Sequence, residues 1–269
     1  MDFFNYKGKK IAFYKKGEGP GMIFLHGFCE DQSMWKAIAA EVPKWGFTFF
    51  SLDLPGFGQS DTIEDCSIEE MAEIVEAFCI ANKLHHITLI GHSMGGYITL
   101  AFAEKYAHRM IALGLIHSHP FADSADKKEA RQKSKEFIQK NGATPYVKQL
   151  IPKLFPAEFA QAKPEIVQPL IEKASNYDPK GIMNALEAMK NRPDRTDVLR
   201  LLDVNNPVLF IIGEKDNLEP QELLISQTHL PQVASIHILE DIGHMGIFEA
   251  PEKINELLGN FAEFISVKR

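Results

Sequence analysis

The stretch Gly91-His92-Ser93-Met94-Gly95 places a serine between two glycines, in the spacing Gly-x-Ser-x-Gly. An apolar run at residues 87–90 precedes it, and a helical pattern at residues 97–107 follows it. Because glycine lacks a Cβ, the two arms of such a strand-to-helix turn can pass closely, and the serine hydroxyl projects from the corner. The helix N-terminus directs N–H groups and positive dipole at the space in front of Ser93. The stretch therefore predicts a nucleophile beside an oxyanion site.

The same residues are also compatible with a plain glycine-rich turn, because this motif arises by chance in chains of this size. A serine hydroxyl is a poor nucleophile at neutral pH and needs a base within hydrogen-bond reach. A histidine base benefits from a carboxylate that fixes its tautomer. After Ser93 the chain offers Asp216 and then His244, each near the end of a predicted strand. Ser, Asp, His is the order expected when such a turn supplies the nucleophile.

Other residues of the same types compete for these roles. Glu214 or Asp241 could supply the carboxylate in place of Asp216. His117 and His119 also end a predicted strand and could face the same cleft, but they lack a nearby acid. We therefore favour Asp216 as the carboxylate and expect the other four residues to lie outside the reacting group.

Three residues near the predicted site are assigned structural roles. His26 is interpreted as a side chain that stabilises a turn, and Asp53 as an acceptor that braces a loop containing Pro and Gly. Cys29 is interpreted as a small buried apolar residue, with a second nucleophile as the alternative. None of the three is expected to carry a proton or an acyl group.

The elements that must position these residues alternate between strands and helices. Strands are predicted at residues 3–6, 10–14, 22–25, 47–52, 87–90, 111–116, 208–212 and 235–239, and helices at 34–42, 67–82, 97–107, from 219 and at 251–264. This alternation predicts an α/β fold, with a mostly parallel sheet of about eight strands and helices on both faces. His26, Asp53, Ser93, Asp216 and His244 all fall at carboxyl ends of strands, where open α/β sheets place their reacting loops.

The middle of the chain has a different pattern. Residues 119–193 show helical periodicity only, with helices predicted at 127–140, 146–154, 164–175 and 180–190. We predict a core formed by residues 1–118 and 194–269, with residues 119–193 inserted as an all-helical cap, or lid. The cap would roof an apolar pocket. Its large apolar residues are candidates for the lining, although packing is the commoner role of such residues: Phe121, Phe137, Phe155, Phe159, Met183 and Met189.

These motifs together resemble the α/β-hydrolase family, in a serine-nucleophile, esterase-like form with an inserted cap. The resemblance covers the chain outside the cap and rests on His26-Gly27-Phe28, Asp53-Leu54-Pro55-Gly56-Phe57-Gly58-Gln59-Ser60, Gly91-His92-Ser93-Met94-Gly95-Gly96, Gly213-Glu214-Lys215-Asp216 and Gly243-His244. It implies Ser93 as nucleophile, His244 as general base and acid, and Asp216 as the orienting acid. It also implies an oxyanion hole formed by the backbone N–H groups of Phe28 and Met94, whose side chains would line the pocket floor.

The resemblance implies a hydrolase that cleaves small to medium carboxylic esters through an acyl-enzyme, without metal or organic cofactor. Carbon–carbon bonds, thioesters, lactones and amides are alternatives on the same groups. An aspartate nucleophile is excluded, because the position is Ser93. A ligand-sensing signalling protein with slow turnover is a further alternative, since fold does not fix function.

Composition narrows the class of protein. The 269 residues are 45% hydrophobic with a net charge of −7, which suits one large core and disfavours nucleic-acid binding. The pairs Lys15-Lys16 and Lys127-Lys128 are interpreted as solvated surface. No membrane span or secretion signal is predicted, and three cysteines at unrelated spacings indicate free thiols in a reducing cytoplasm. The expected partner is a small-molecule acyl substrate. No repeat or heptad indicates an oligomeric state.

Overall fold

The computed structural model describes residues 1–267 and is built around an eight-stranded sheet in the order β1-β2-β4-β3-β5-β6-β7-β8. The strands are β1 (Asp2–Tyr6), β2 (Lys9–Lys16), β3 (Gly21–Leu25), β4 (Thr48–Leu52), β5 (Ile87–His92), β6 (Met110–Ile116), β7 (Val208–Gly213) and β8 (Ala234–Leu239). The first two pairings, β1–β2 and β2–β4, are antiparallel, and all pairings from β4 to β8 are parallel. The predicted α/β fold class is confirmed.

The central strands are apolar throughout because both faces of the sheet are covered. Every residue of β3 is buried. Its side chains alternate, so that Ile23 and Leu25 pack into the core on one face, and Met22 and Phe24 into the core on the other. Such two-sided burial explains why this strand reads as a continuous apolar run.

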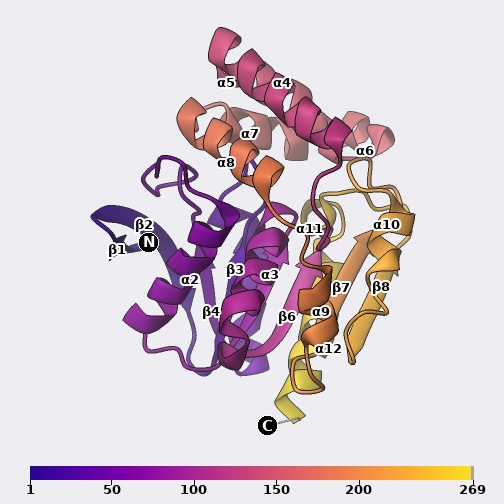
Figure 1. Ribbon diagram of the computed structural model, residues 1–269. Coiled ribbons are helices and arrows are strands. Elements are labelled where there is room, and N and C mark those ends of the chain that lie inside the picture. Colours follow the sequence, from indigo (N-terminus) through magenta and orange to yellow (C-terminus); the bar gives the residue numbers. More distant parts are fainter. Residues whose placement is uncertain (268–269) are drawn as a thin grey trace.

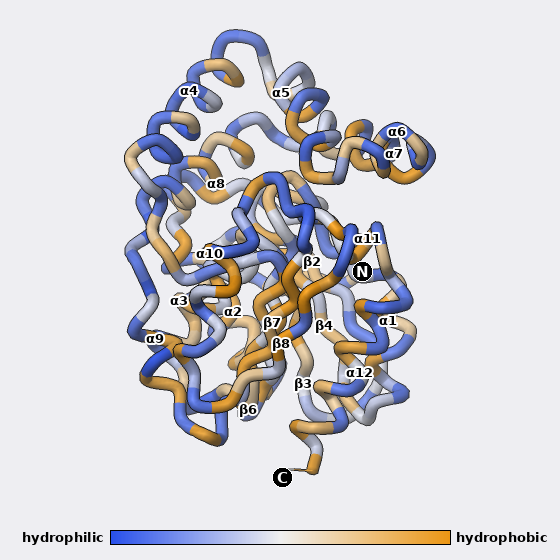
Figure 2. The backbone as a smooth tube through the Cα atoms, turned by 90° about the vertical axis from the view of Figure 1, so that its right-hand side faces the viewer, coloured by the Kyte–Doolittle hydropathy of each residue, from blue (hydrophilic) through white to orange (hydrophobic). Residues whose placement is uncertain are grey.

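Helices form a layer on each face of the sheet (Figure 2). One layer holds α2 (Ile68–Ala81), α3 (Met94–Tyr106) and α9 (Thr196–Leu201), and the other holds α1 (Lys36–Glu41) and α12 (Pro251–Val267). The predicted N-cap of α2 is present, since the Ser67 side chain accepts the Glu70 N–H. Shorter elements complete the two layers: η1 (Gln32–Trp35), η2 (Val42–Trp45), η3 (Ala107–Arg109), α10 (Gln221–Ser226) and α11 (Gly246–Glu249).

A group of helices between β6 and α9 lies over the carboxyl ends of the strands (Figure 1). It consists of α4 (Ala125–Asn141), α5 (Ala143–Leu150), η4 (Ile151–Leu154), α6 (Ala157–Ala162), α7 (Pro164–Ala174) and α8 (Pro179–Asn191). The helical insertion is therefore confirmed, and α6 is an addition to the helices predicted there. Its division from the core at residues 119 and 193 stays a prediction, and we refer to residues 119–193 as the cap segment.

The cap segment is attached to the core by polar contacts and by one close backbone approach. Asp31, which precedes η1, accepts hydrogen bonds from Lys173 Nζ at 3.2 Å and from the Tyr177 hydroxyl at 2.8 Å. Gly56 in a core loop meets Gly181 in α8 so closely that a Cβ on Gly56 would lie 2.5 Å from the Gly181 Cα. Only glycine fits at this contact, so the loop and α8 are held in one relative position.

Asp53 braces its loop as predicted. Its side chain accepts backbone N–H groups from Gln32 and from Gln59, each at 2.8 Å, and the residue is only 1% exposed. We expect Asp53→Ala to lower the free energy of unfolding by about 2–4 kcal/mol, because two backbone N–H groups lose a buried, charged acceptor. The exposed Asp61, which accepts the Lys10 N–H, is the matched control, and Asp61→Ala should cost below about 1 kcal/mol. Urea unfolding of both variants measures the difference, and equal losses would contradict the bracing role.

Two further expectations concern cysteines and membranes. Cys29, Cys66 and Cys79 are all buried and unpaired, as the sequence indicates for free thiols. Within residues 1–267, no helix combines the length and the apolar character that a bilayer crossing requires.

Candidate active site

Ser93 occupies a strained corner between β5 and α3. Its backbone has φ 49° and ψ −115°, in a region that L-residues rarely adopt, and such strain is found where a turn is held by its surroundings. The holding contacts are its own N–H, which donates to the Ile116 carbonyl at 2.9 Å, and its carbonyl, which accepts the Ser118 hydroxyl at 2.8 Å. A Cβ on Gly95 would lie 2.3 Å from the Leu25 carbonyl oxygen, so the helix can approach β3 only with glycine there.

The structure brings Ser93, His244 and Asp216 together, although they are far apart in the chain. His244 Nε2 lies 2.9 Å from Ser93 Oγ, and His244 Nδ1 lies 2.7 Å from Asp216 Oδ2. Because a carboxylate can only accept, Nδ1 carries the proton and the lone pair of Nε2 faces the serine hydroxyl. Asp216 is itself fixed by the backbone N–H groups of Leu218 and Glu219, at 2.9 and 3.0 Å.

The two alternative acids lie elsewhere. Glu214 and Asp241 are exposed, and the Glu214 carboxylate accepts the Asp241 N–H at 3.2 Å. The Asp241 carboxylate forms an ion pair with Lys215 at 2.6 Å. These acids form a surface cluster, whereas the Asp216 side chain is fully buried against His244.

Charge and burial oppose each other in the His244–Asp216 pair. Burial alone would lower the pKa of His244, but the charge and hydrogen bond of Asp216 outweigh it and raise that pKa above its ordinary value. Burial alone would raise the pKa of Asp216, yet His244 and the backbone donors hold it well below its usual range. Asp216 is therefore ionised at neutral pH and stabilises a positive charge on His244.

His117 and His119 do have acids close by, so the expectation that they lack one is wrong. His117 Nδ1 lies 3.8 Å from Asp216 Oδ2, and His119 Nε2 lies 3.2 Å from Glu219 Oε2. Burial lowers the pKa of both histidines, and that of His117 strongly. His117 Nδ1 accepts the Gly213 N–H at 3.2 Å, so this neutral ring supports the strand end, and it is not part of the lining of the cavity at Ser93.

The loop after β3 and the start of α3 border the space in front of Ser93. Met94 is the first residue of α3, where a backbone N–H has no acceptor within the helix. The Phe28 side chain lines the cavity described below, as expected, but the Met94 side chain is fully buried in the core and does not line it. The floor prediction is therefore wrong for Met94. Cys29 is buried, and this burial raises the pKa of its thiol well above the ordinary value, which fits the role of a small apolar residue.

His26 joins two loops beside the site, in agreement with its predicted role. Its Nδ1 donates to the Gly27 carbonyl at 2.8 Å, and its Nε2 accepts the Leu54 N–H at 2.9 Å. Both ring nitrogens are therefore engaged with backbone groups. The imidazole fixes the loop after β3 against the loop after β4.

Sequence reasoning missed a buried pair formed by Glu30 and His92. Glu30 Oε2 accepts the Gly27 N–H at 3.1 Å and lies 3.1 Å from His92 Nδ1, and His92 Nε2 donates to the His244 carbonyl at 2.9 Å. Because the His244 carbonyl can only accept, His92 Nε2 carries a proton. An unprotonated Nδ1 and a carboxylate oxygen are both acceptors, so the contact between His92 Nδ1 and Glu30 Oε2 requires a second proton. Glu30 and His92 are 4% and 1% exposed. The pair holds the backbone of His244 in place.

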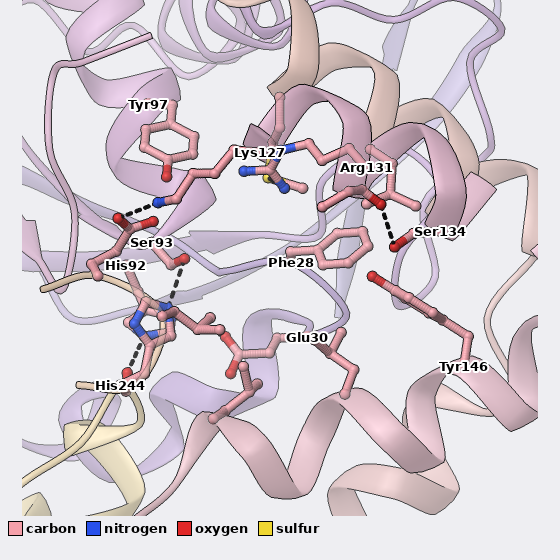
Figure 3. A pocket seen from close by; sticks show the side chains of 17 residues that line it. Phe28, Glu30, His92, Ser93, Tyr97, Lys127, Arg131, Ser134, Tyr146 and His244 are labelled. Carbon is pink, nitrogen blue, oxygen red and sulfur yellow. Dashed lines mark hydrogen bonds and ion pairs between the residues drawn. The ribbon is translucent and has the colours of Figure 1, made fainter. Parts of the chain in front are cut away.

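A cavity of about 210 Å³ opens in front of Ser93, beneath the cap segment (Figure 3). Its lining from the core is Phe28, Glu30, His92, Ser93, Tyr97, Leu218, Glu219 and His244, and its lining from the cap segment is Lys127, Ala130, Arg131, Ser134, Tyr146, Leu150, Leu154, Leu186 and Met189. Of the six apolar candidates from the sequence, Met189 alone is among these residues. Phe155 illustrates the packing role, because it is buried and its ring stacks on Phe159 at 5.4 Å.

Charged residues also reach the cavity, which the sequence did not predict. Lys127 was expected on the solvated surface, but it forms an ion pair with Glu219 and lines the cavity. Its side chain is 36% exposed, so the lysine is partly solvated as expected and also borders the cavity. Burial alone would raise the pKa of Glu219, but His119 and Lys127 together lower it to about 2. Arg131 reaches the same space from α4, where it is bound to Asp123.

Comparison with known proteins agrees with this arrangement. A model of the α/β-hydrolase fold family matches residues 20–251. The 3-oxoadipate enol-lactonase 1 of Acinetobacter baylyi is 24% identical over 265 residues, which cover 97% of this chain and 96% of that relative. Lipase 1 of Psychrobacter immobilis is 24% identical over 280 residues, with coverage of 97% and 82%. The structure of a thermophilic esterase from Thermogutta terrifontis, with malate bound, has a TM-score of 0.90 at 29% identity and covers 98% of this chain and 97% of its own.

A parallel sheet with a serine at the strained turn after its central strand is the architecture of an α/β hydrolase. Since the family match extends from β3 to the start of α12 and includes the whole cap segment, the chain belongs to the α/β-hydrolase fold family. It is an enzyme of the hydrolase class.

Proposed function

We propose that the protein is a serine hydrolase that cleaves small to medium carboxylic esters through an acyl-enzyme intermediate. The observation that carries this proposal is the double contact of His244, with Ser93 at 2.9 Å on one ring nitrogen and Asp216 at 2.7 Å on the other. Nucleophile, base and orienting acid need this mutual geometry.

In the proposed reaction, Ser93 Oγ attacks the substrate carbonyl carbon while His244 Nε2 takes the hydroxyl proton. The backbone N–H groups of Phe28 and Met94 stabilise the oxyanion of the tetrahedral intermediate. Collapse of this intermediate breaks the ester bond, and His244 gives its proton to the departing alcohol. Water then attacks the acyl-enzyme, with His244 as its base, and releases the carboxylic acid. Asp216 stays ionised and stabilises the imidazolium in both steps.

The cap segment sets the proposed substrate size. A cavity of about 210 Å³ is at the small end of ligand pockets, which favours short acyl groups. We infer that residues 119–193 act as a cap that limits water and substrate length. The buried free thiols of Cys29, Cys66 and Cys79 also support a cytoplasmic setting, where such thiols stay reduced.

Lactone hydrolysis is the second candidate on the same groups. It is supported by the similarity to an enol-lactonase over nearly the whole length of both chains. Carbon–carbon, thioester and amide bonds remain alternatives that the same nucleophile serves, and a slow ligand-sensing protein is the alternative outside catalysis. A panel of p-nitrophenyl esters, γ-lactones, thioesters and anilides distinguishes the bonds by their relative kcat/KM.

Covalent labelling tests the proposal directly. A fluorophosphonate should add to one residue, mapped by peptide mass spectrometry to Ser93, and should abolish turnover of p-nitrophenyl butyrate in proportion to labelling. Sustained turnover after the first acyl group is released supports an enzyme, and a single turnover would favour the sensor. Labelling of another residue, with Ser93 unmodified, would contradict the proposal.

The proposal also predicts a loss of activity at acid pH. Only neutral His244 can accept the Ser93 proton, so kcat/KM should fall as pH decreases through the His244 pKa. Because Asp216 raises that pKa, the midpoint of the acid limb should lie above the ordinary value of 6.5. The measurement is kcat/KM from about pH 5 to about pH 9, with circular dichroism at each pH to exclude unfolding. A midpoint well below 6.5 would show that His244 is not the base.

A further inference from the structure

A cluster of positive side chains lies over the nucleophile. Lys127 and Arg131 project from successive turns of α4 and line the same cavity as Ser93, and Figure 3 shows the Arg131 guanidinium pointing into the space that Phe28 and Ser93 border. Arg192, just after α8, belongs to the same cluster because it shares the carboxylate of Asp123 with Arg131.

The cations in this cluster outnumber its carboxylates. Arg131 and Arg192 share one buried carboxylate, Asp123, with Arg192 Nη1 at 2.7 Å from its Oδ1. Lys127 uses a second carboxylate, Glu219, to which the ring of His119 also turns. Burial lowers the pKa of His119, so that ring adds no positive charge at neutral pH. Three cations therefore face two carboxylates.

Two guanidinium donors in the cluster are poorly satisfied. Among the described residues, the acceptor of Arg131 Nη1 is the Met189 thioether, at 3.4 Å, which is a weak acceptor. Arg192 is 3% exposed, and its Nε has no hydrogen-bond partner within residues 1–267, while its guanidinium lies 3.8 Å from the centre of the Tyr97 ring. Arg131 and Met189 both line the cavity, so the weakly satisfied Nη1 of Arg131 lies at the place of the substrate, whereas the Tyr97 ring lies between Arg192 and the cavity.

The other acids near the cavity do not supply the missing negative charge to Arg131. Glu30 is engaged with His92 and Gly27 beneath the nucleophile. Asp123 supplies one negative charge to two guanidinium groups that are buried or partly buried, which is unfavourable, and an anionic ligand would restore the balance. A carboxylate suits this place best, because its two oxygens match the planar fork of arginine.

We propose that the natural substrate is an ester or lactone that itself carries a carboxylate, which Arg131 binds with the help of Lys127. This inference rests on the proposed function, since it assigns the substrate class of the same site. The carboxylate belongs to the acyl part, as in the half-ester of a dicarboxylic acid, or to the alcohol part, and the experiment has one arm for each.

Matched ester pairs test the inference. In the acyl arm, p-nitrophenyl half-esters of glutaric and adipic acid are compared with the same compounds methylated at the free carboxyl, after subtraction of spontaneous hydrolysis. In the alcohol arm, the butyrate ester of 4-hydroxybenzoate is compared with that of methyl 4-hydroxybenzoate. We expect kcat/KM to favour the acid by about 10- to 100-fold in one arm, the range of a charged hydrogen bond. The preference should shrink as salt rises.

Variants assign the preference to the cluster. Arg131→Gln should bring the acid-to-neutral ratio close to one, Arg131→Lys should retain part of it, and Lys127→Gln should reduce it. Lys128→Gln removes the same charge from an exposed neighbour on α4 and should leave the ratio unchanged. If Arg131→Gln does not fold, inhibition of the wild type replaces it, and glutarate should inhibit butyrate ester hydrolysis competitively and more strongly than its monomethyl ester.

The outcomes separate this inference from the proposed function. If fluorophosphonate labels Ser93 and neutral esters are cleaved, but the ratio is one or lower in both arms, the carboxylate inference is wrong and the proposed function stands. An equal loss of the ratio in Lys128→Gln would also overturn the inference, because it would then reflect overall charge. If Ser93 neither labels nor is needed for hydrolysis of any ester, the proposed function fails first.

Discussion

Ser93→Ala is expected to lower kcat for ester hydrolysis by a factor on the order of 10⁴–10⁶. Alanine removes the hydroxyl oxygen that lies 2.9 Å from His244 Nε2, while the backbone donors of the loop after β3 and of α3 stay in place. The residual rate comes from binding and oxyanion stabilisation of direct attack by water. The measurement is kcat and KM for p-nitrophenyl butyrate, with the protein checked for carry-over of wild type.

The control for this variant is the same substitution at a serine that lies away from the cavity. Ser226 on α10 is exposed, and its hydroxyl donates to the Leu223 carbonyl within the same helix, so Ser226→Ala should keep full activity. The unfolding free energy of Ser93→Ala should stay within about 2 kcal/mol of wild type, since within residues 1–267 the hydroxyl makes a single hydrogen bond, to His244 Nε2 at the open cavity, and the backbone contacts that hold the turn are kept. More than about one per cent residual kcat would mean that another group attacks the substrate.

Asp216→Asn is expected to lower kcat by about 10⁴-fold at neutral pH. The amide keeps the size of the side chain but can turn its NH₂ toward His244 Nδ1, which moves the ring proton to Nε2 and removes the acceptor from Ser93. The change also removes the charge that raises the His244 pKa, so the acid limb of any residual activity should shift to lower pH. Both effects are measured from one pH series of kcat/KM.

The control for Asp216→Asn is the same substitution at Asp241, which the sequence offered as an alternative carboxylate. Asp241 is exposed and paired with Lys215, so Asp241→Asn should change kcat less than about twofold. Full activity in Asp216→Asn, or a larger loss in Asp241→Asn, would contradict the assignment of the carboxylate.

The hydrophobic periodicity of the sequence predicted the strands of the sheet and the site residues that follow them. Strands buried on both faces, such as β3 and β7, are apolar at every position, and their spacing placed Ser93, Asp216 and His244 at one edge of the sheet. Carboxyl ends of parallel strands meet there by geometry. The contacts among these three side chains agree with that expectation, while their catalytic roles stay proposals.

The charged part of the cavity could not be predicted, because its partners are distant in the chain. Lys127 precedes Glu219 by 92 residues, and nothing in the sequence around Lys127 distinguishes it from the exposed Lys128. The acid beside His119 was missed for the same reason. Ion pairs between segments depend on how α4 is placed over the sheet, and local pattern contains no information on that placement.

The sequence also did not predict the shortest helices or the direction in which the Met94 side chain points. The helices α6 and α11 span six and four residues, too few to show a helical period. α3 begins at Met94, three positions earlier than the apolar pattern indicates, and the Met94 side chain points into the core. Sequence pattern did not distinguish this direction from one toward the cavity.

The buried pair of Glu30 and His92 links parts of the site that are usually considered separately. One line of hydrogen bonds runs from the Gly27 N–H, next to Phe28, through Glu30 and His92 to the carbonyl of His244. His92, which precedes Ser93, thus bridges the loop after β3 and the loop after β8 and fixes the distance between them. Substitutions in those two loops should consequently be non-additive in a double-mutant cycle, because each displacement is transmitted to the other loop through the same imidazole.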